Sequence, residues 1–155
     1  MQNLVTLLMQ WQHNTMEIQI KLGNVQVTNL LFEVKTFENE ITNNLETELK
    51  FSAVFAEDSD TSFAIVFDIF ISDENKEFNL QAKITSHFET NVPIDEQFKN
   101  STFVKISAPA IAFPYIRAFI SNITLNSGYN PVMLPSFNFI KIAEEQDAEK
   151  QKNEM

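Results

Sequence analysis

The sequence predicts an α+β fold in which four strands come first and two helices follow. Three observations support this order. Apolar and polar residues alternate in segments between residues 16 and 88, which is the period of a half-buried strand. Short polar stretches separate the later segments, as turns do. After residue 108 the apolar residues recur at helical spacing instead.

The first strand pattern begins at Met16. Its alternating apolar positions are Ile18, Ile20, Leu22, Val25 and Val27. Gly23 interrupts the alternation, and a glycine inside a strand predicts a bulge or a bend. Residues 34–46 are polar, with isolated apolar positions, and we expect them to form a long connection.

The remaining strands are predicted at residues 47–56, 63–71 and 78–88. Residues 63–71 are apolar on both faces, which predicts a central strand covered on both sides. The connections at 57–62 and 72–77 are short and polar, so the three strands should form an antiparallel meander.

The long helix is predicted from Pro109 to Asn126, with Gly128 as its terminator. Pro114 lies inside it, where a proline ring clashes with the preceding turn, so a kink or a two-part start is expected. Two neighbouring apolar stripes can face the sheet. The first consists of Tyr115, Phe119 and Ile123, and the second of Ile116, Ile120 and Thr124.

A loop over 129–138 should lead to a shorter C-terminal helix that starts at Phe139 or Ile140. We therefore expect a folded domain over residues 17–143. Residues 144–155 are predicted to be a charged, frayed tail. Residues 1–16 are predicted to be a disordered or weakly helical extension, and Met16 is an alternative translation start.

Composition excludes several classes of protein. The formal net charge of −10 disfavours nucleic acid, which is bound through Lys and Arg. No apolar run reaches the roughly 20 residues of a membrane span, and no basic, apolar secretory start is present, so a cytoplasmic protein is expected. The chain has 0 cysteines and 2 histidines, His13 and His87, so nucleophilic triad chemistry is poorly supplied and a His-rich metal site is not available. We expect no enzyme and no cofactor.

Phenylalanine is unusually abundant, with 15 copies against 1 Trp and 2 Tyr. A Phe ring buries a large area without needing a hydrogen-bond partner. The abundance is consistent with a Phe-rich core and with an apolar surface that binds other chains.

The segment from Ala108 to Phe139 resembles the C-terminal half of SecB, the bacterial protein-export chaperone. That family carries a Phe-Pro-Tyr-Ala-Arg-like core followed by a proline-punctuated loop that closes on Asn-Phe. The matching residues are Phe113, Pro114, Tyr115, Arg117, Gly128, Pro131, Leu134, Pro135, Asn138 and Phe139, with Ile116 in place of the alanine. The resemblance covers about residues 17–142 and is looser in the strands.

The resemblance implies a four-stranded antiparallel sheet with the long helix packed on one face, and a homotetramer assembled as a dimer of dimers. It also implies an ATP-independent holdase that binds unfolded precursor polypeptides in apolar grooves and needs no catalytic residue. The aligned groove residues are Phe32, Phe37, Leu49, Phe51, Phe55 and Ile140. The aligned inter-subunit strand carries Leu80, Ala82 and Ile84. For the strand residues in both sets, an ordinary role in the core remains open.

The docking site for the SecA motor is where this chain departs from the family. The family's first strand carries an Asp-Ile-Ser-Phe-Glu-like motif, but here Asn29 replaces the aspartate and only Glu33 is kept. A later Leu-x-Glu contact aligns with Asn79-Leu80-Gln81, so its apolar and acidic members are lost. Neutral replacements weaken charge-assisted contacts with a basic partner. We therefore expect weak SecA docking, and the alternative function is an interaction module with one dedicated partner, such as an antitoxin-guarding chaperone.

Overall fold

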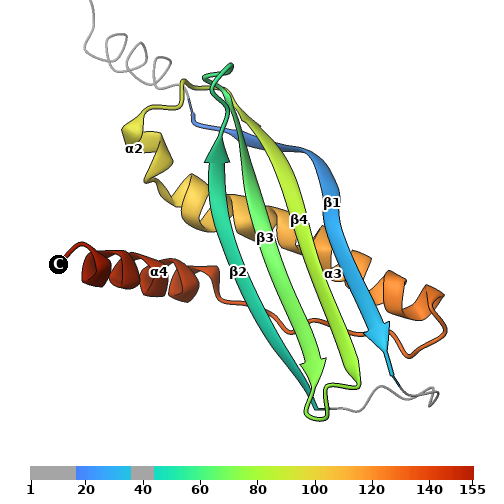
Figure 1. Ribbon diagram of the computed structural model, residues 1–155. Helices are drawn as coiled ribbons and strands as arrows, with labels where there is room; N and C mark the ends of the chain where they lie inside the picture. The colour runs from blue at the N-terminus through green and yellow to red at the C-terminus, as the bar shows by residue number, and fades with distance from the viewer. Residues whose placement is uncertain (1–16, 36–43) are drawn as a thin grey trace, which may run out of the picture.

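The computed structural model describes residues 17–35 and 44–155, which form an α+β fold (Figure 1). Four strands make one antiparallel sheet in the order β1-β4-β3-β2. Their bounds are β1 Ile20–Val34, β2 Leu45–Phe55, β3 Ser62–Asp73 and β4 Phe78–Thr90. The predicted fold class is confirmed.

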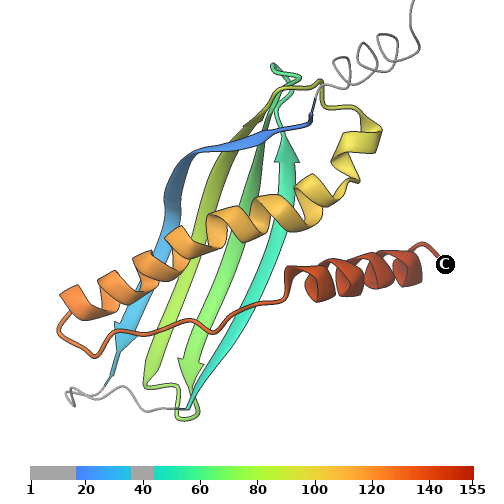
Figure 2. The same ribbon diagram turned by 180° about the vertical axis from the view of Figure 1, so that it is seen from behind.

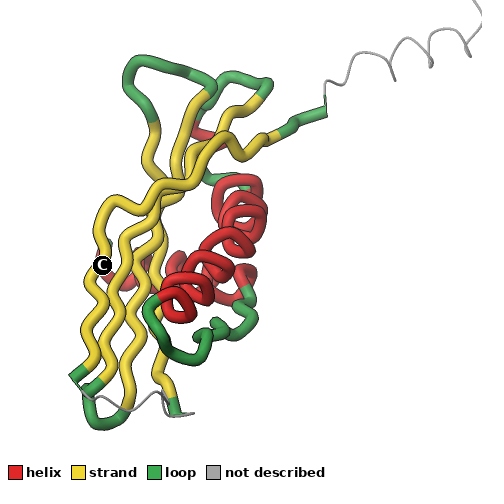
Figure 3. Tube along the Cα trace, turned by 90° about the vertical axis from the view of Figure 1, so that its right-hand side faces the viewer, coloured by secondary structure: helices red, strands yellow, loops and turns green. Residues whose placement is uncertain are grey.

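The helices follow the sheet in sequence. They are α2 Glu96–Lys99, the π-helical turn η1 Phe103–Ser107, α3 Ala108–Asn126 and α4 Phe139–Asn153. Figure 2 shows α3 running diagonally across one face of the sheet, with α4 on the same side near β2. The edge-on view in Figure 3 places α3 on that one side, which we call the inner face.

Strand pairing confirms the predicted meander. Strand β3 pairs with β2 on one side and β4 on the other, and β1 closes the sheet by pairing with β4. The β1–β4 register shifts between Leu22 and Val25, where Gly23 predicted a bulge, and again between Val27 and Asn29. Consequently β1 and β2 are the two edges of the sheet.

The core lies between α3 and the inner face. Alternate residues of β3 and β4 supply it, including Phe67, Ile69, Leu80 and Ile84, which are all 0% exposed. Burying such large side chains contributes about 1.5–3 kcal/mol each to folding. This clustering explains why strand alternation was readable in the sequence.

Helix α3 presents the second of the two predicted stripes to the sheet. Ile116, Ile120 and Thr124 are buried, whereas Tyr115 is 58% exposed. Assigning Tyr115 to a buried stripe was therefore wrong. The helix is apolar around most of its circumference, so periodicity alone could not say which stripe meets the sheet.

The prediction that β3 is covered on both faces is also wrong for this chain by itself. The face opposite α3, which we call the outer face, is left open by the described residues, and Phe70 on β3 is 39% exposed there. Outer-face Asp68 lies beside Lys83 of β4, with an ion-pair distance of 3.4 Å. The apolar run in β3 was thus not a sign of cover on both sides.

The helical irregularity lies upstream of the place predicted from Pro114. Helix α3 is assigned as unbroken through Pro114, while the π turn η1 directly precedes Ala108. By length and composition the stretch Glu96–Asn126 would qualify as a membrane span. Its buried stripe packs on the sheet instead, so its apolar character serves the core.

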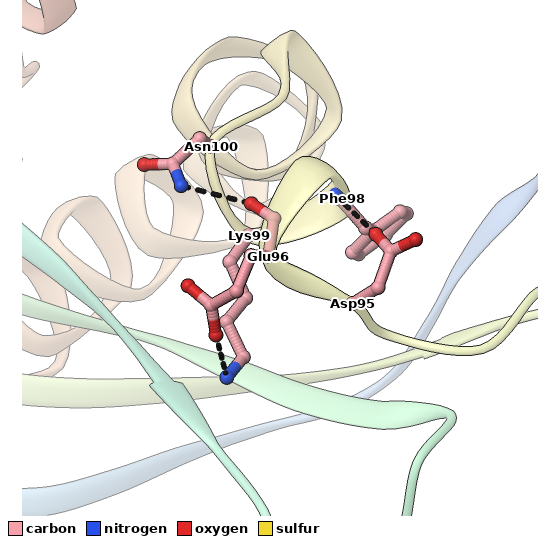
Figure 4. A network of polar contacts seen from close by, with 5 residues as sticks. All are labelled: Asp95, Glu96, Phe98, Lys99 and Asn100. Atoms are coloured by element: carbon pink, nitrogen blue, oxygen red, sulfur yellow. Dashed lines mark hydrogen bonds and ion pairs between the residues drawn. The ribbon is translucent and has the colours of Figure 1, made fainter.

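A capped turn fixes the start of this helical stretch (Figure 4). The Asp95 carboxylate accepts a hydrogen bond of 2.8 Å from the Phe98 amide, which is an N-cap interaction. Lys99 pairs with Glu96 at 2.9 Å, and the Asn100 side chain donates to the Glu96 carbonyl at 2.8 Å. The turn thereby holds Phe98 in the core, with its ring centroid 5.7 Å from that of Phe63.

Helix α4 starts at Phe139 as predicted, but it is longer than the sequence indicated. Asn138 caps it by accepting from the Lys141 amide at 3.2 Å. The helix continues to Asn153, so the predicted fraying from residue 144 differs from the structure. Contacts of Gln146 and Asp147 with β2 and η1 hold this polar part in place.

Candidate functional site

Alternate residues of the edge strand β2 point their backbone groups away from the sheet. In an antiparallel pair, successive residues point their N–H and C=O groups alternately toward and away from the partner strand. The Ala56 amide donates to Ser62 of β3, whereas the Phe51 carbonyl accepts from the Gln146 side chain outside the sheet, at 3.2 Å. The two bonds agree: even-numbered residues of β2 point their backbone groups toward β3, and odd-numbered residues point them away. The backbone groups of Leu49, Phe51, Ala53 and Phe55 therefore face outward from the sheet edge.

The same residues direct half-buried apolar side chains to the inner face. The Phe51 ring lies 5.9 Å from both Phe67 and Phe139, between the sheet and the start of α4. The Phe55 ring stacks on Phe63 at 6.2 Å, and the Lys99 ammonium lies 5.5 Å from its centroid. Leu49, Phe51 and Phe55 thus form one apolar row along an open edge, which we call the β2 groove.

The other predicted groove residues do not all join this row. Phe32 lies on β1, at the opposite edge of the sheet, and contacts Phe78 and Tyr129. Ile140 is 55% exposed on the first turn of α4, near the groove. Phe37 lies outside the described residues. The set therefore divides between two edges of the sheet.

Sequence reasoning missed two residues of α4 that contact Phe51. Phe139, rather than Ile140, packs on Phe51, and Gln146 reaches the Phe51 carbonyl. Phe139, Ala143 and Gln146 share one helix face by their spacing, which was the available signal. A hollow of about 340 Å³ lies beside them, between β2, α4 and the ends of α2 and η1.

The predicted motor-docking set gathers on the outer face. Glu33 of β1 lies directly opposite Asn79 of β4, and Asn79 accepts a hydrogen bond of 3.4 Å from Gln81. These three residues line a hollow of about 380 Å³ that Phe70 also lines. Asn29 lies further along β1, opposite Lys83. Three of the four residues that the alignment selected therefore lie together in the structure.

Cations surround this set. Lys35 and Lys76 line the same hollow as Glu33, and Lys83 faces Asn29. Nearby, the hydrogen bond and the charge of Glu48 raise the pKa of Lys50. The outer face therefore carries mixed charge rather than an acidic patch.

The predicted inter-subunit residues lie in the core. Leu80, Ala82 and Ile84 are buried on the inner face of β4, and β4 is flanked by β1 and β3. This is the core role that the sequence left open for these three residues. Their participation in a subunit interface stays a prediction. A different apolar surface is exposed on α3 through Ile111, Tyr115 and Leu125.

Comparison with known proteins agrees with this architecture. The Methanocaldococcus jannaschii relative, an uncharacterized protein, is 32% identical over 123 residues, covering 72% of this chain and 74% of its own. The protein-export protein SecB of Acidovorax sp. is 24% identical over 147 residues, covering 94% of this chain and 77% of its own. A Mycobacterium tuberculosis SecB-like chaperone, solved in complex with a ChAD peptide from the HigA1 antitoxin, has a similar fold, with a TM-score of 0.62 at 10% identity over 77% of this chain and 90% of that one.

The family model described as preprotein translocase subunit SecB matches residues 12–150. That range spans the sheet and all of the described helices except the last residues of α4. The resemblance inferred from the Phe-Pro-Tyr-Ile-Arg segment is thereby confirmed, and the chain belongs to the SecB family.

Proposed function

We propose that this protein is an ATP-independent holdase chaperone that binds unfolded polypeptide along the β2 groove. The observation that carries the proposal is the coincidence of two features on one strand. Leu49, Phe51 and Phe55 turn apolar side chains to the inner face, and their backbone groups point out of the sheet edge. An extended client can therefore add a strand and bury its apolar side chains at the same time.

Such a mode suits clients of varied sequence. Backbone hydrogen bonds do not depend on side-chain identity, and apolar burial is non-directional. A client segment with alternating apolar residues would place them beside the β2 row, because side chains of adjacent strands lie about 4.5–5.5 Å apart. Membership of the SecB family supports this assignment.

The test is suppression of aggregation of a slow-folding precursor. Phe51→Ser should lower the activity at least severalfold, whereas Phe70→Ser, the same change on the outer face, should leave it intact. Thermal unfolding of both variants checks that each is folded. A peptide probe with N-methyl groups on alternate residues should bind more weakly than its unmethylated form, because it cannot pair with the β2 edge. If the two serine variants have equal activity, the β2 groove is not the site that binds clients.

Assembly as a homotetramer belongs to the same proposal. Exposed Ile111, Tyr115 and Leu125 recur on α3 at the spacing of a helix-packing seam. On the neighbouring edge of the sheet, Val27 and Leu30 of β1 are each 40% exposed. A self-complementary surface of this kind would pair two copies around a two-fold axis. A dimer of such dimers would leave the β2 edges free for clients.

A second candidate is a chaperone with one dedicated partner. The antitoxin peptide bound to the Mycobacterium tuberculosis chaperone supports it, since that neighbour has a similar fold. The mixed charge around Glu33 also supports it, because delivery to SecA would need an acidic docking patch. Affinity capture from cells at physiological salt separates the two candidates. Capture of many unrelated precursors would indicate a cytoplasmic chaperone for general export. Capture of one stoichiometric protein would indicate a dedicated partner.

A further inference from the structure

Helix α4 is fastened over the β2 groove by polar contacts in its middle. The Lys105 ammonium of η1 lies 3.0 Å from both carboxylate oxygens of Asp147. The preceding residue, Gln146, donates its side-chain N–H to the Phe51 carbonyl at 3.2 Å. Two adjacent residues of α4 thus hold two separate elements, the π turn and the edge strand.

The Gln146 contact occupies an atom that a client strand would use. The Phe51 carbonyl points out of the sheet edge, where the N–H of an added strand would donate to it. With Gln146 in place, that acceptor is already engaged and α4 lies across the path of the strand. The closed position of α4 and a strand paired at Phe51 are therefore mutually exclusive.

The attachment of α4 is unequal along its length. Phe139 and Ala143 are buried, and the Phe139 ring also contacts Phe113, so the first turns belong to the core. The part that follows is held by polar contacts that leave Lys105 and Asp147 partly exposed, at 29% and 44%. Polar contacts at partly exposed sites are individually weak. This part can therefore leave the groove without exposing the core.

We propose that Gln146 and Asp147 form a latch that closes the β2 groove, and that clients bind only when this latch opens. The inference rests on the proposed function, because it concerns access to the same groove. The apparent affinity for a client is then the intrinsic affinity multiplied by the open fraction. Weakening the latch should tighten client binding until the groove is open all the time.

The first measurement is binding of a fluorescein-labelled 20-residue peptide of alternating apolar and polar residues, which is longer than the 11 residues of β2. Asp147→Ala and Gln146→Ala should each tighten binding about three- to tenfold, which corresponds to about 0.7–1.4 kcal/mol. The matched control, Glu144→Ala, removes an exposed carboxylate from the same helix and should change nothing. Lys105→Glu should tighten binding as well, and adding Asp147→Lys should restore wild-type affinity by rebuilding the pair in reverse.

A second measurement reports on the latch without any client. The chain has 0 cysteines, so spin labels can be placed at Ser52→Cys on β2 and Glu149→Cys on α4. In the free protein, Asp147→Ala and Gln146→Ala should lengthen and broaden the label-to-label distance, and the Lys105/Asp147 swap should reverse this change.

The two measurements separate the latch from the proposed function. If neither the wild-type protein nor any variant binds the peptide, the groove proposal fails. The label-to-label distances alone then show whether Gln146 and Asp147 hold α4 against β2. Unchanged distances together with unchanged or weaker peptide binding in the folded single variants would overturn it. Circular dichroism confirms folding, and the charge swap provides a variant with the same side-chain types when a single change destabilises the protein.

Discussion

The buried hydroxyl of Thr124 allows a sharp prediction about how the loop before α4 is held. Its Oγ1 donates to the carbonyls of Ile120 and Ser121, each at 3.0 Å, and accepts a hydrogen bond of 2.9 Å from the Val132 amide. Thr124 is 0% exposed, so no water replaces these partners on mutation. This one side chain therefore ties the loop to the end of α3.

Thr124→Val keeps the shape of the side chain and removes its hydroxyl. The Val132 amide is then buried without an acceptor, which costs about 1–3 kcal/mol, whereas the helix carbonyls keep their backbone partners. No cavity forms, so the lost hydrogen bond accounts for the whole change. For a chain of this size, about 2 kcal/mol should lower the melting temperature by roughly 4–8 °C.

Thr124→Ser is the matched control. It keeps the hydroxyl and loses one buried methyl group, which should cost about 1 kcal/mol. Urea unfolding at fixed protein concentration measures both variants, because oligomerisation makes stability depend on concentration. Hydrogen exchange at the Val132 amide should rise in Thr124→Val and stay near wild type in Thr124→Ser. Unchanged hydrogen exchange at the Val132 amide in Thr124→Val would refute this account of the loop.

Three further predictions concern the helical cap, the assembly and the motor. Asp95→Ala removes the N-cap acceptor of the Phe98 amide and should destabilise the protein by about 1 kcal/mol in denaturant titration, with Asp95→Asn close to wild type. Leu125→Glu combined with Tyr115→Glu places charges on the exposed surface of α3 and should reduce the mass measured by light scattering; a tetramer that persists would exclude this surface. The zinc-bearing tail peptide of a SecA motor should bind weakly or undetectably near physiological ionic strength, since Glu33 alone keeps the acidic character of the docking set. Micromolar binding that drops on Glu33→Ala would instead make this chain a conventional export chaperone.

Much of the fold could be predicted because its signals are local. Alternation in β2 and β4 reflects a sheet with one buried face, and the bulge near Gly23 follows from the interrupted pattern. The start of α4 was predicted within one residue because Asn138 precedes the apolar turn. Its length was not, because the contacts of Gln146 and Asp147 join residues far apart in sequence.

The candidate site was predicted less completely. Leu49, Phe51 and Phe55 were selected by alignment and do lie together, but Phe32 was placed with them although β3 and β4 separate its strand from β2. Strand order is a tertiary property, and no local pattern in β1 reveals which strand it pairs with. Similarly, the role of Gln146 depends on which way the Phe51 carbonyl points, and that phase is set by pairing with β3.

The sequence by itself determined the α+β class, the strand and helix order and the family, because periodicity and the Phe-Pro-Tyr-Ile-Arg segment are properties of neighbouring residues. Tertiary structure alone decided three other features: the stripe of α3 that meets the sheet, the open outer face of β3 and the fastening of α4 at the β2 edge. Each of these features depends on which segments, distant in sequence, come together in the fold. An apolar side chain is stabilised equally by any suitable neighbour, so the sequence specifies that Tyr115 or Phe70 is apolar without specifying what covers it.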